Sequence, residues 1–213
     1  MATKTDERVP SIASQFAAPH GLLGHVAGWL MAGNDDMNVH VIELLDIQSA
    51  DAVLEIGSGP GRALARAAER ATKGFIAGVD VSDVMIAQAR RRNREAIRAG
   101  RVELRLAGVS HLPYPDARFD TALAINSYYF WPRPEADLRE VKRVLKPGGV
   151  LALGLRARDA SRGAMYNHRS LSEEQIAAIA HTLARAGFEL LRTERARLRS
   201  QSAVILLARK VTA

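Results

Sequence analysis

The chain has 213 residues, of which 47% are hydrophobic, and this length and composition are typical of one globular α/β domain with a full core. No apolar run is long enough to span a membrane, and residues 1–10 lack the apolar core of a signal peptide, so we expect a cytoplasmic protein. Because cysteine is absent, the sequence excludes disulfides, thiolate metal sites and a cysteine nucleophile, and no other pattern predicts a metal.

The formal net charge of +7 is concentrated in one arginine-rich stretch. Such a run could bind the phosphates of a nucleic acid, or it could form the solvated face of a helix. No aromatic residue lies within it to stack on a base, so we expect no nucleic-acid partner. The arginines are Arg90, Arg91, Arg92, Arg94, Arg98, Arg101 and Arg105.

Two segments before the first predicted strand are expected to be short helices, at residues 22–31 and 37–47. The first is apolar with small residues interspersed. They either cover the functional site or simply pack on the sheet. We therefore assign residues 1–48 to a tail with cap helices and residues 49–213 to the main domain.

The main domain alternates between predicted strands and helices, which is typical of a doubly wound sheet. Strands are predicted at residues 52–56, 75–79, 102–106, 119–125 and 150–155, with helices at 62–68, 83–98 and 134–146. Pro60 is expected in the first turn of its helix. A capping-box sequence at Ser172 opens the last helix, which Gly187 ends. Two final strands, 188–193 and 203–208, are expected to close the sheet as an antiparallel hairpin, giving seven mostly parallel strands.

A glycine-rich turn follows the first predicted strand, with glycine at Gly57, Gly59 and Gly61. Glycine permits a tight turn and lets a ligand approach the backbone. The dinucleotide pattern G-x-G-x-x-G would need glycine at Arg62 and is absent. Asp80 closes the second strand, where a carboxylate can accept hydrogen bonds from two ribose hydroxyls. The pattern predicts a nucleotide-type site.

Glu55 together with the three glycines and Asp80 resembles the class I S-adenosylmethionine-dependent methyltransferases. The stretches 112–116 and 145–149 also match this broad family, which includes the ubiquinone/menaquinone-biosynthesis methyltransferases. The resemblance covers residues 39–210. It implies a Rossmann-like α/β fold, S-adenosylmethionine as cofactor, and methyl transfer that needs neither a metal nor a covalent intermediate.

The resemblance also implies which residues border the cofactor. The glycine turn would lie against the methionine and ribose portions, Asp80 would bind the ribose, and Val81 and Met85 would flank the adenine. Val109 departs from the family, because an aspartate often binds the adenine amino group at this position, and Ser110 or backbone groups would replace it. The implied cofactor-binding residues are Glu55, Gly57, Ser58, Gly59, Gly61, Asp80, Val81, Met85, Val109, Ser110 and Asn126.

We expect the acceptor to contact the first cap segment, the turn after the fourth strand and the loop after the fifth. The candidate substrate-binding residues are His20, His25, Trp29, Tyr128, Tyr129, Tyr166 and His168. Asn126 and Tyr129 keep the spacing of the N-P-P-Y motif of amino-group methyltransferases, but both prolines are absent. The sequence identifies no general base.

Three functions are compatible with these patterns. The first, which we favour, is methyl transfer to a small molecule. The second is methylation of RNA, with the arginine-rich stretch as its phosphate-binding face. The third is a protein that binds the cofactor without catalysis. The acceptor and the oligomeric state are not predicted.

Overall fold

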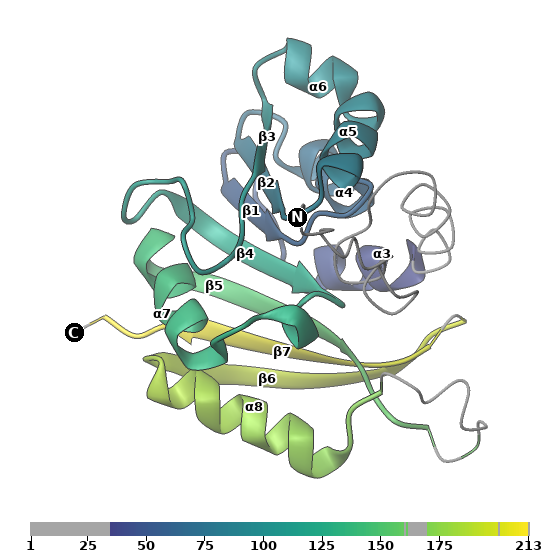
Figure 1. The fold of residues 1–213 in the computed structure, drawn as a ribbon, viewed down its shortest axis with the longest axis vertical. Coiled ribbons are helices and arrows are strands. Elements are labelled where there is room, and N and C mark those ends of the chain that lie inside the picture. The colour runs from purple at the N-terminus through teal and green to yellow at the C-terminus, as the bar shows by residue number, and fades with distance from the viewer. Residues whose placement is uncertain (1–34, 160, 162–169, 200, 213) are drawn as a thin grey trace, which may run out of the picture.

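The computed structural model describes residues 35–159, 161, 170–199 and 201–212, and it contains one seven-stranded sheet (Figure 1). The strands are β1 Ala52–Ile56, β2 Phe75–Asp80, β3 Val102–Leu106, β4 Phe119–Ile125, β5 Leu145–Arg156, β6 Phe188–Arg197 and β7 Ser202–Lys210. The described helices are α3 Asp35–Leu44, α4 Arg62–Arg70, α5 Asp83–Arg92, α6 Arg94–Arg98, the 3-10 helix η2 Tyr128–Phe130, α7 Pro134–Val144 and α8 Glu173–Arg185.

The strand order is β3-β2-β1-β4-β5-β7-β6, in which β1 to β5 are parallel and β7 is antiparallel to both neighbours. This confirms the predicted doubly wound sheet with a terminal hairpin. The parallel strands place their carboxyl ends at one edge, where ligands bind in such folds.

Two apolar cores lie on opposite faces of the sheet, and the two helical layers can be followed in Figure 1. One core contains buried residues of α3, α4 and α5, and the other contains those of α7 and α8. Each helix presents one apolar stripe to the sheet, which is why the strands between them carry almost continuous apolar sequence.

The predicted helix at 83–98 is interrupted at Asn93, which separates α5 from α6. The buried Asn93 side chain donates hydrogen bonds to the carbonyls of Gly61 at 3.0 Å and Ala89 at 2.9 Å. The interruption therefore has a tertiary cause, because Asn93 joins the end of α5 to the glycine turn.

Two further boundaries differ from the sequence prediction. Pro60 precedes the helix, because Gly61 has a φ of 74° and α4 begins at Arg62. Leu145 and Lys146, predicted at the end of the helix, belong to β5 instead, which begins at Leu145 and not at Val150. Lys146 is held there by both carboxylate oxygens of Asp120, each at 2.8 Å from its Nζ.

The second predicted cap helix corresponds to α3, which packs directly on the sheet. A Cβ at Gly154 in β5 would lie 3.1 Å from Val41 and 3.4 Å from Met37. The first predicted cap helix lies outside the described residues, and the division at residue 48 stays a prediction. None of the described helices has the length and apolar character needed to cross a bilayer. The described residues also hold no cluster of metal-ligating side chains.

Candidate functional site

The glycine turn is fixed between the carboxyl ends of β1 and β2. The backbone N–H groups of Gly57 and Ser58 donate to the Val79 carbonyl at 2.9 and 3.0 Å. Gly57 has a φ of 75°, and a Cβ there would lie 2.5 Å from the Ser127 Cβ, which is too close for any other residue. The turn thus needs glycine both for its backbone angle and for its contact with the segment after β4.

Asp80 closes the turn from the end of β2. Its Oδ2 accepts from the Gly59 N–H at 2.8 Å and its Oδ1 from the Ser82 N–H at 2.9 Å. Burial raises the pKa of Asp80, while these backbone donors act in the opposite direction. Each carboxylate oxygen has a further lone pair, so both can still accept a hydrogen bond from a ribose hydroxyl. The geometry fits the role that the sequence implies for Asp80.

Within the described ranges, several buried polar atoms without a hydrogen-bond partner lie near the carboxyl ends of β1 and β4. They are Glu55 Oε2, Ser58 Oγ, and both Oδ1 and Nδ2 of Asn126. Asn126 also has a φ of 53°, a left-handed conformation that costs energy in a non-glycine residue. Buried polar groups in folded proteins normally have partners. A ligand that carries both donors and acceptors, as the amino acid portion of S-adenosylmethionine does, would supply them.

Replacing Glu55 with glutamine is expected to stabilise the cofactor-free protein at pH 8 by about 1–3 kcal/mol, because the variant no longer buries a carboxylate of which one oxygen, Oε2, has no partner among the described residues. Burial, with a smaller contribution from the Asp80 charge, raises the pKa of Glu55 well above its ordinary value of 4.5. The folded protein therefore holds this proton more tightly than the unfolded chain, and wild-type stability falls as pH rises through the raised pKa. Urea unfolding at pH 5 and pH 8 measures this slope, which should be smaller in Glu55→Gln. If the pH dependence of stability were the same in wild type and in Glu55→Gln, Glu55 would not be the group with the raised pKa.

The end of β2 and the end of β3 form an apolar surface beside Asp80. Val81 is 54% exposed and Leu106 is 60% exposed, and Leu106 pairs with Asp80 in the sheet. Val81 therefore remains available for the adenine contact that the sequence implies. Leu106 is a candidate that sequence reasoning missed, because a leucine at a strand end resembles core. Met85 is only 2% exposed, and its contact with the adenine stays a prediction.

The segment after β3 offers fewer polar side chains for a contact with adenine than the sequence suggests. Val109 is buried in the core beneath α7. The Ser110 hydroxyl donates to Asp137 Oδ1 at 2.7 Å, so its proton is already used inside the protein. Contacts of Val109 and Ser110 with the cofactor stay predictions, and an acceptor for the adenine amino group would come from Ser110 Oγ or from a backbone carbonyl of this segment.

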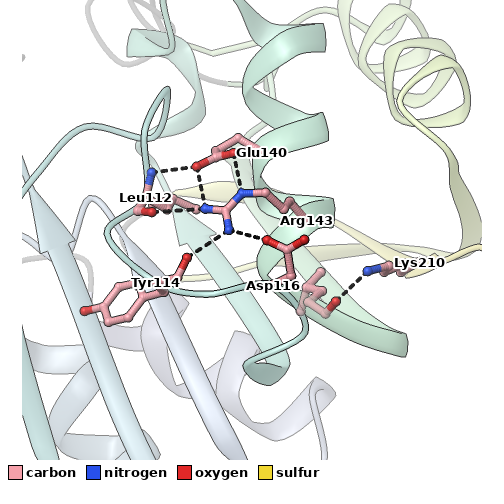
Figure 2. Close-up of polar contacts among 7 residues, drawn as sticks. Leu112, Tyr114, Asp116, Glu140, Arg143 and Lys210 are labelled. Atoms are coloured by element: carbon pink, nitrogen blue, oxygen red, sulfur yellow. Dashed lines mark hydrogen bonds and ion pairs between the residues drawn. The ribbon is translucent and has the colours of Figure 1, made fainter.

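Arg143 in α7 anchors the same segment, as Figure 2 shows. Its guanidinium donates to the carbonyls of Leu112 at 3.1 Å and Tyr114 at 2.9 Å, and to Asp116 Oδ1 at 2.7 Å. Glu140 accepts both from Arg143 and from the Leu112 N–H. A basic residue in the last turn of a helix is usually explained by the helix dipole, so the sequence carried no signal of this role.

The predicted acceptor site is described only in part. Tyr128 is buried, with its ring centroid 5.1 Å from that of Trp131. The Tyr129 hydroxyl accepts a hydrogen bond from the Arg156 N–H at the end of β5, and burial raises the pKa of Tyr129 to about 12. Both rings thus support the turn after β4, and their contact with an acceptor stays a prediction. The other candidates lie outside the described residues: His20, His25, Trp29, Tyr166 and His168.

A family model described as a methyltransferase domain matches residues 54–153. The chain is 28% identical over 186 residues to the uncharacterized methyltransferase YdaC of Bacillus subtilis, covering 87% of this chain and 98% of that protein. It is 32% identical over 135 residues to the 27-O-demethylrifamycin SV methyltransferase of Amycolatopsis mediterranei, covering 63% of this chain and 49% of that protein. The chain therefore spans nearly all of the first relative and about half of the second.

Two solved structures share the fold. The cyclase SpnF superposes with a TM-score of 0.70 at 27% identity, covering 84% of this chain and 81% of that one. A SAM-dependent methyltransferase from Aquifex aeolicus superposes with a TM-score of 0.69 at 22% identity, covering 82% and 89%. The matched family model, these likenesses, the strand order and the turn that Asp80 closes agree with one another. The chain belongs to the class I methyltransferases, enzymes that use S-adenosylmethionine as their cofactor.

Proposed function

We propose that this enzyme transfers the methyl group of S-adenosylmethionine to a small-molecule acceptor. The observation that carries the proposal is Asn126, at the end of β4 beside the glycine turn. Both of its amide atoms are shielded from solvent and have no hydrogen-bond partner in the described part of the chain. A shielded polar position at the reacting edge suits an acceptor that can be enclosed, whereas a polymer needs an open groove. The named acceptor of the rifamycin relative is likewise a small molecule.

Chemically, the residues at this edge would position the acceptor and exclude water. The sulfonium of the bound cofactor supplies a methyl group with a good leaving group already in place. Asn126 has an acceptor, Oδ1, and a donor, Nδ2, so one atom can contact the amino acid portion of the cofactor while the other orients an acceptor hydroxyl or amine toward the turn. Tyr129 is unsuited to take up a proton near neutral pH, because its pKa of about 12 keeps it protonated.

The arginine-rich stretch gives little support to an RNA acceptor. Arg92 donates to the Pro60 carbonyl at 3.0 Å, and Arg101 donates to the Ala68 carbonyl at 3.0 Å. Arg105 donates to the Pro113 carbonyl at 2.7 Å and lies 4.9 Å from the centroid of the Tyr114 ring. These guanidinium groups thus connect neighbouring segments of the protein, and they do not form one free phosphate-binding row.

The test is a methyl-transfer assay with radiolabelled S-adenosylmethionine against two acceptor preparations, a small-molecule extract and total RNA. We expect label in the small-molecule fraction only. The triple variant Arg91→Ala/Arg94→Ala/Arg98→Ala should transfer the methyl group as well as wild type, because these side chains are exposed at the end of α5 and on α6.

Label in RNA that falls steeply with salt, and that the triple variant loses, would overturn the proposal in favour of RNA methylation. Binding of S-adenosylhomocysteine without transfer to either preparation would favour the non-catalytic alternative.

A further inference from the structure

Arg156 occupies the carboxyl end of β5, on the same edge of the sheet as the cofactor turn. Gly154, two residues earlier in β5, accepts a hydrogen bond from the Asn126 N–H at 2.8 Å. The Arg156 N–H donates to the Tyr129 hydroxyl. Since β4 lies between β1 and β5, Arg156 is two strands away from the glycine turn. Two strand spacings correspond to about 10 Å, which is the length of a small organic acceptor.

The Arg156 side chain lies on the face of the sheet that α3 covers. Side chains two residues apart on a strand share a face, and the neighbouring Gly154 position faces Val41 of α3. Arg156 Nε donates to Gln201 Oε1 at 2.9 Å, and Gln201 is completely buried. The guanidinium plane is therefore fixed by a buried amide from the segment that leads into β7.

Arg156 and Gln201 together carry more hydrogen-bond donors than the protein pairs with acceptors. Gln201 Nε2 is buried and has no hydrogen-bond partner among the residues that the structure describes. In the part of the chain that the structure describes, no carboxylate forms an ion pair with Arg156. The Nη atoms of Arg156 and the Nε2 of Gln201 all donate and none accepts. A ligand that matches them must supply acceptors alone and carry negative charge.

We propose that Arg156, positioned by Gln201, binds a carboxylate of the acceptor, so that the substrate of this methyltransferase is a small organic acid. The planar guanidinium matches a carboxylate through two parallel hydrogen bonds, whereas an ammonium group would act as a point charge. The proposal rests on the proposed function and narrows it: the methylated atom lies near Asn126 at the end of β4, and the acid group lies one strand further along the sheet edge, about 5 Å away.

The test uses the protein loaded with S-adenosylhomocysteine and compares benzoate with benzamide, which has the same shape but no charge. Calorimetry should give at least tenfold tighter binding for benzoate. Arg156→Gln should reduce the preference for benzoate over benzamide to within twofold. Arg156→Lys should retain only part of this preference, because lysine lacks the planar guanidinium that forms two parallel hydrogen bonds. Gln201→Leu should weaken benzoate binding without removing the charge. Arg158→Gln is the matched control, because Arg158 is an exposed arginine two residues further along.

Equal binding of the two probes, no saturable benzoate binding, or a preference that survives in Arg156→Gln would each overturn the proposal. Binding of S-adenosylhomocysteine is measured first in every variant and should stay within twofold of wild type, which excludes misfolding. A wild type that methylates only neutral small molecules would refute the acid specificity while leaving the proposed function intact. A wild type that methylates no small molecule would refute the proposed function itself.

Discussion

Replacing Asp80 with alanine is expected to weaken binding of S-adenosylhomocysteine by about 3 kcal/mol, or about 100-fold, because hydrogen bonds to a charged group contribute roughly 1.5–3 kcal/mol each. The variant loses two kinds of contact at once. It removes the carboxylate that we expect to accept from the ribose hydroxyls, and it releases the N–H groups of Gly59 and Ser82 that the carboxylate holds. Isothermal calorimetry measures the change directly.

Two further variants separate these contributions. Asp80→Asn keeps the size of the side chain and one acceptor oxygen, so its loss of affinity should be smaller than that of alanine. Glu69→Ala removes an exposed carboxylate from the end of α4, the helix that follows the turn, and should leave affinity unchanged. If Asp80→Ala binds S-adenosylhomocysteine as tightly as wild type, Asp80 does not belong to the cofactor site.

Gly61→Ala is expected to destabilise the protein by about 2–4 kcal/mol, the sum of backbone strain and overpacking. Gly61 has a φ of 74°, and an added Cβ would lie 2.9 Å from the Ala89 Cα and 2.6 Å from the Asn93 amide nitrogen. The first of these atoms is backbone and cannot move without shifting α5. Urea unfolding gives the change in free energy.

Gly100 provides the matched control for this experiment. Its φ of 69° is nearly the same, but a Cβ there would meet nothing within 4 Å. Gly100→Ala should therefore cost only the backbone strain, about 1 kcal/mol. Equal losses in the two variants would mean that the contact between the turn and α5 contributes nothing to stability.

Much of the sheet could be predicted because local sequence determines it. The strands β1, β3 and β4 begin and end where the apolar runs do, and the capping box at Ser172 is present with both of its hydrogen bonds. The predicted long helix failed at Asn93, because the amide satisfies a carbonyl of Gly61 that is 32 residues away in sequence. Helix propensity depends on nearby residues only, so it cannot predict a hydrogen bond to a residue so distant in sequence.

The candidate site divides in the same way. The glycines could be proposed because they form a short, continuous motif after β1, and Asp80 could be proposed because it ends the next strand, β2. Arg156 and Gln201 could not, since their hydrogen bond joins residues 45 positions apart and exists only after β5 has paired with β7. The sequence around Gln201 has no charge pattern or motif that would mark it.

The place of β7 in the sheet has a consequence for synthesis on the ribosome. β7 lies between β5 and β6 but follows both in the chain. A nascent chain therefore passes through a stage in which the cofactor edge formed by β1 to β4 can assemble while β5 still has an open side and β6 has no strand to pair with. Leu190 and Leu191 of β6 are apolar and about 40% exposed even in the finished fold. This interval is when the emerging protein is most open to chaperone binding and to aggregation.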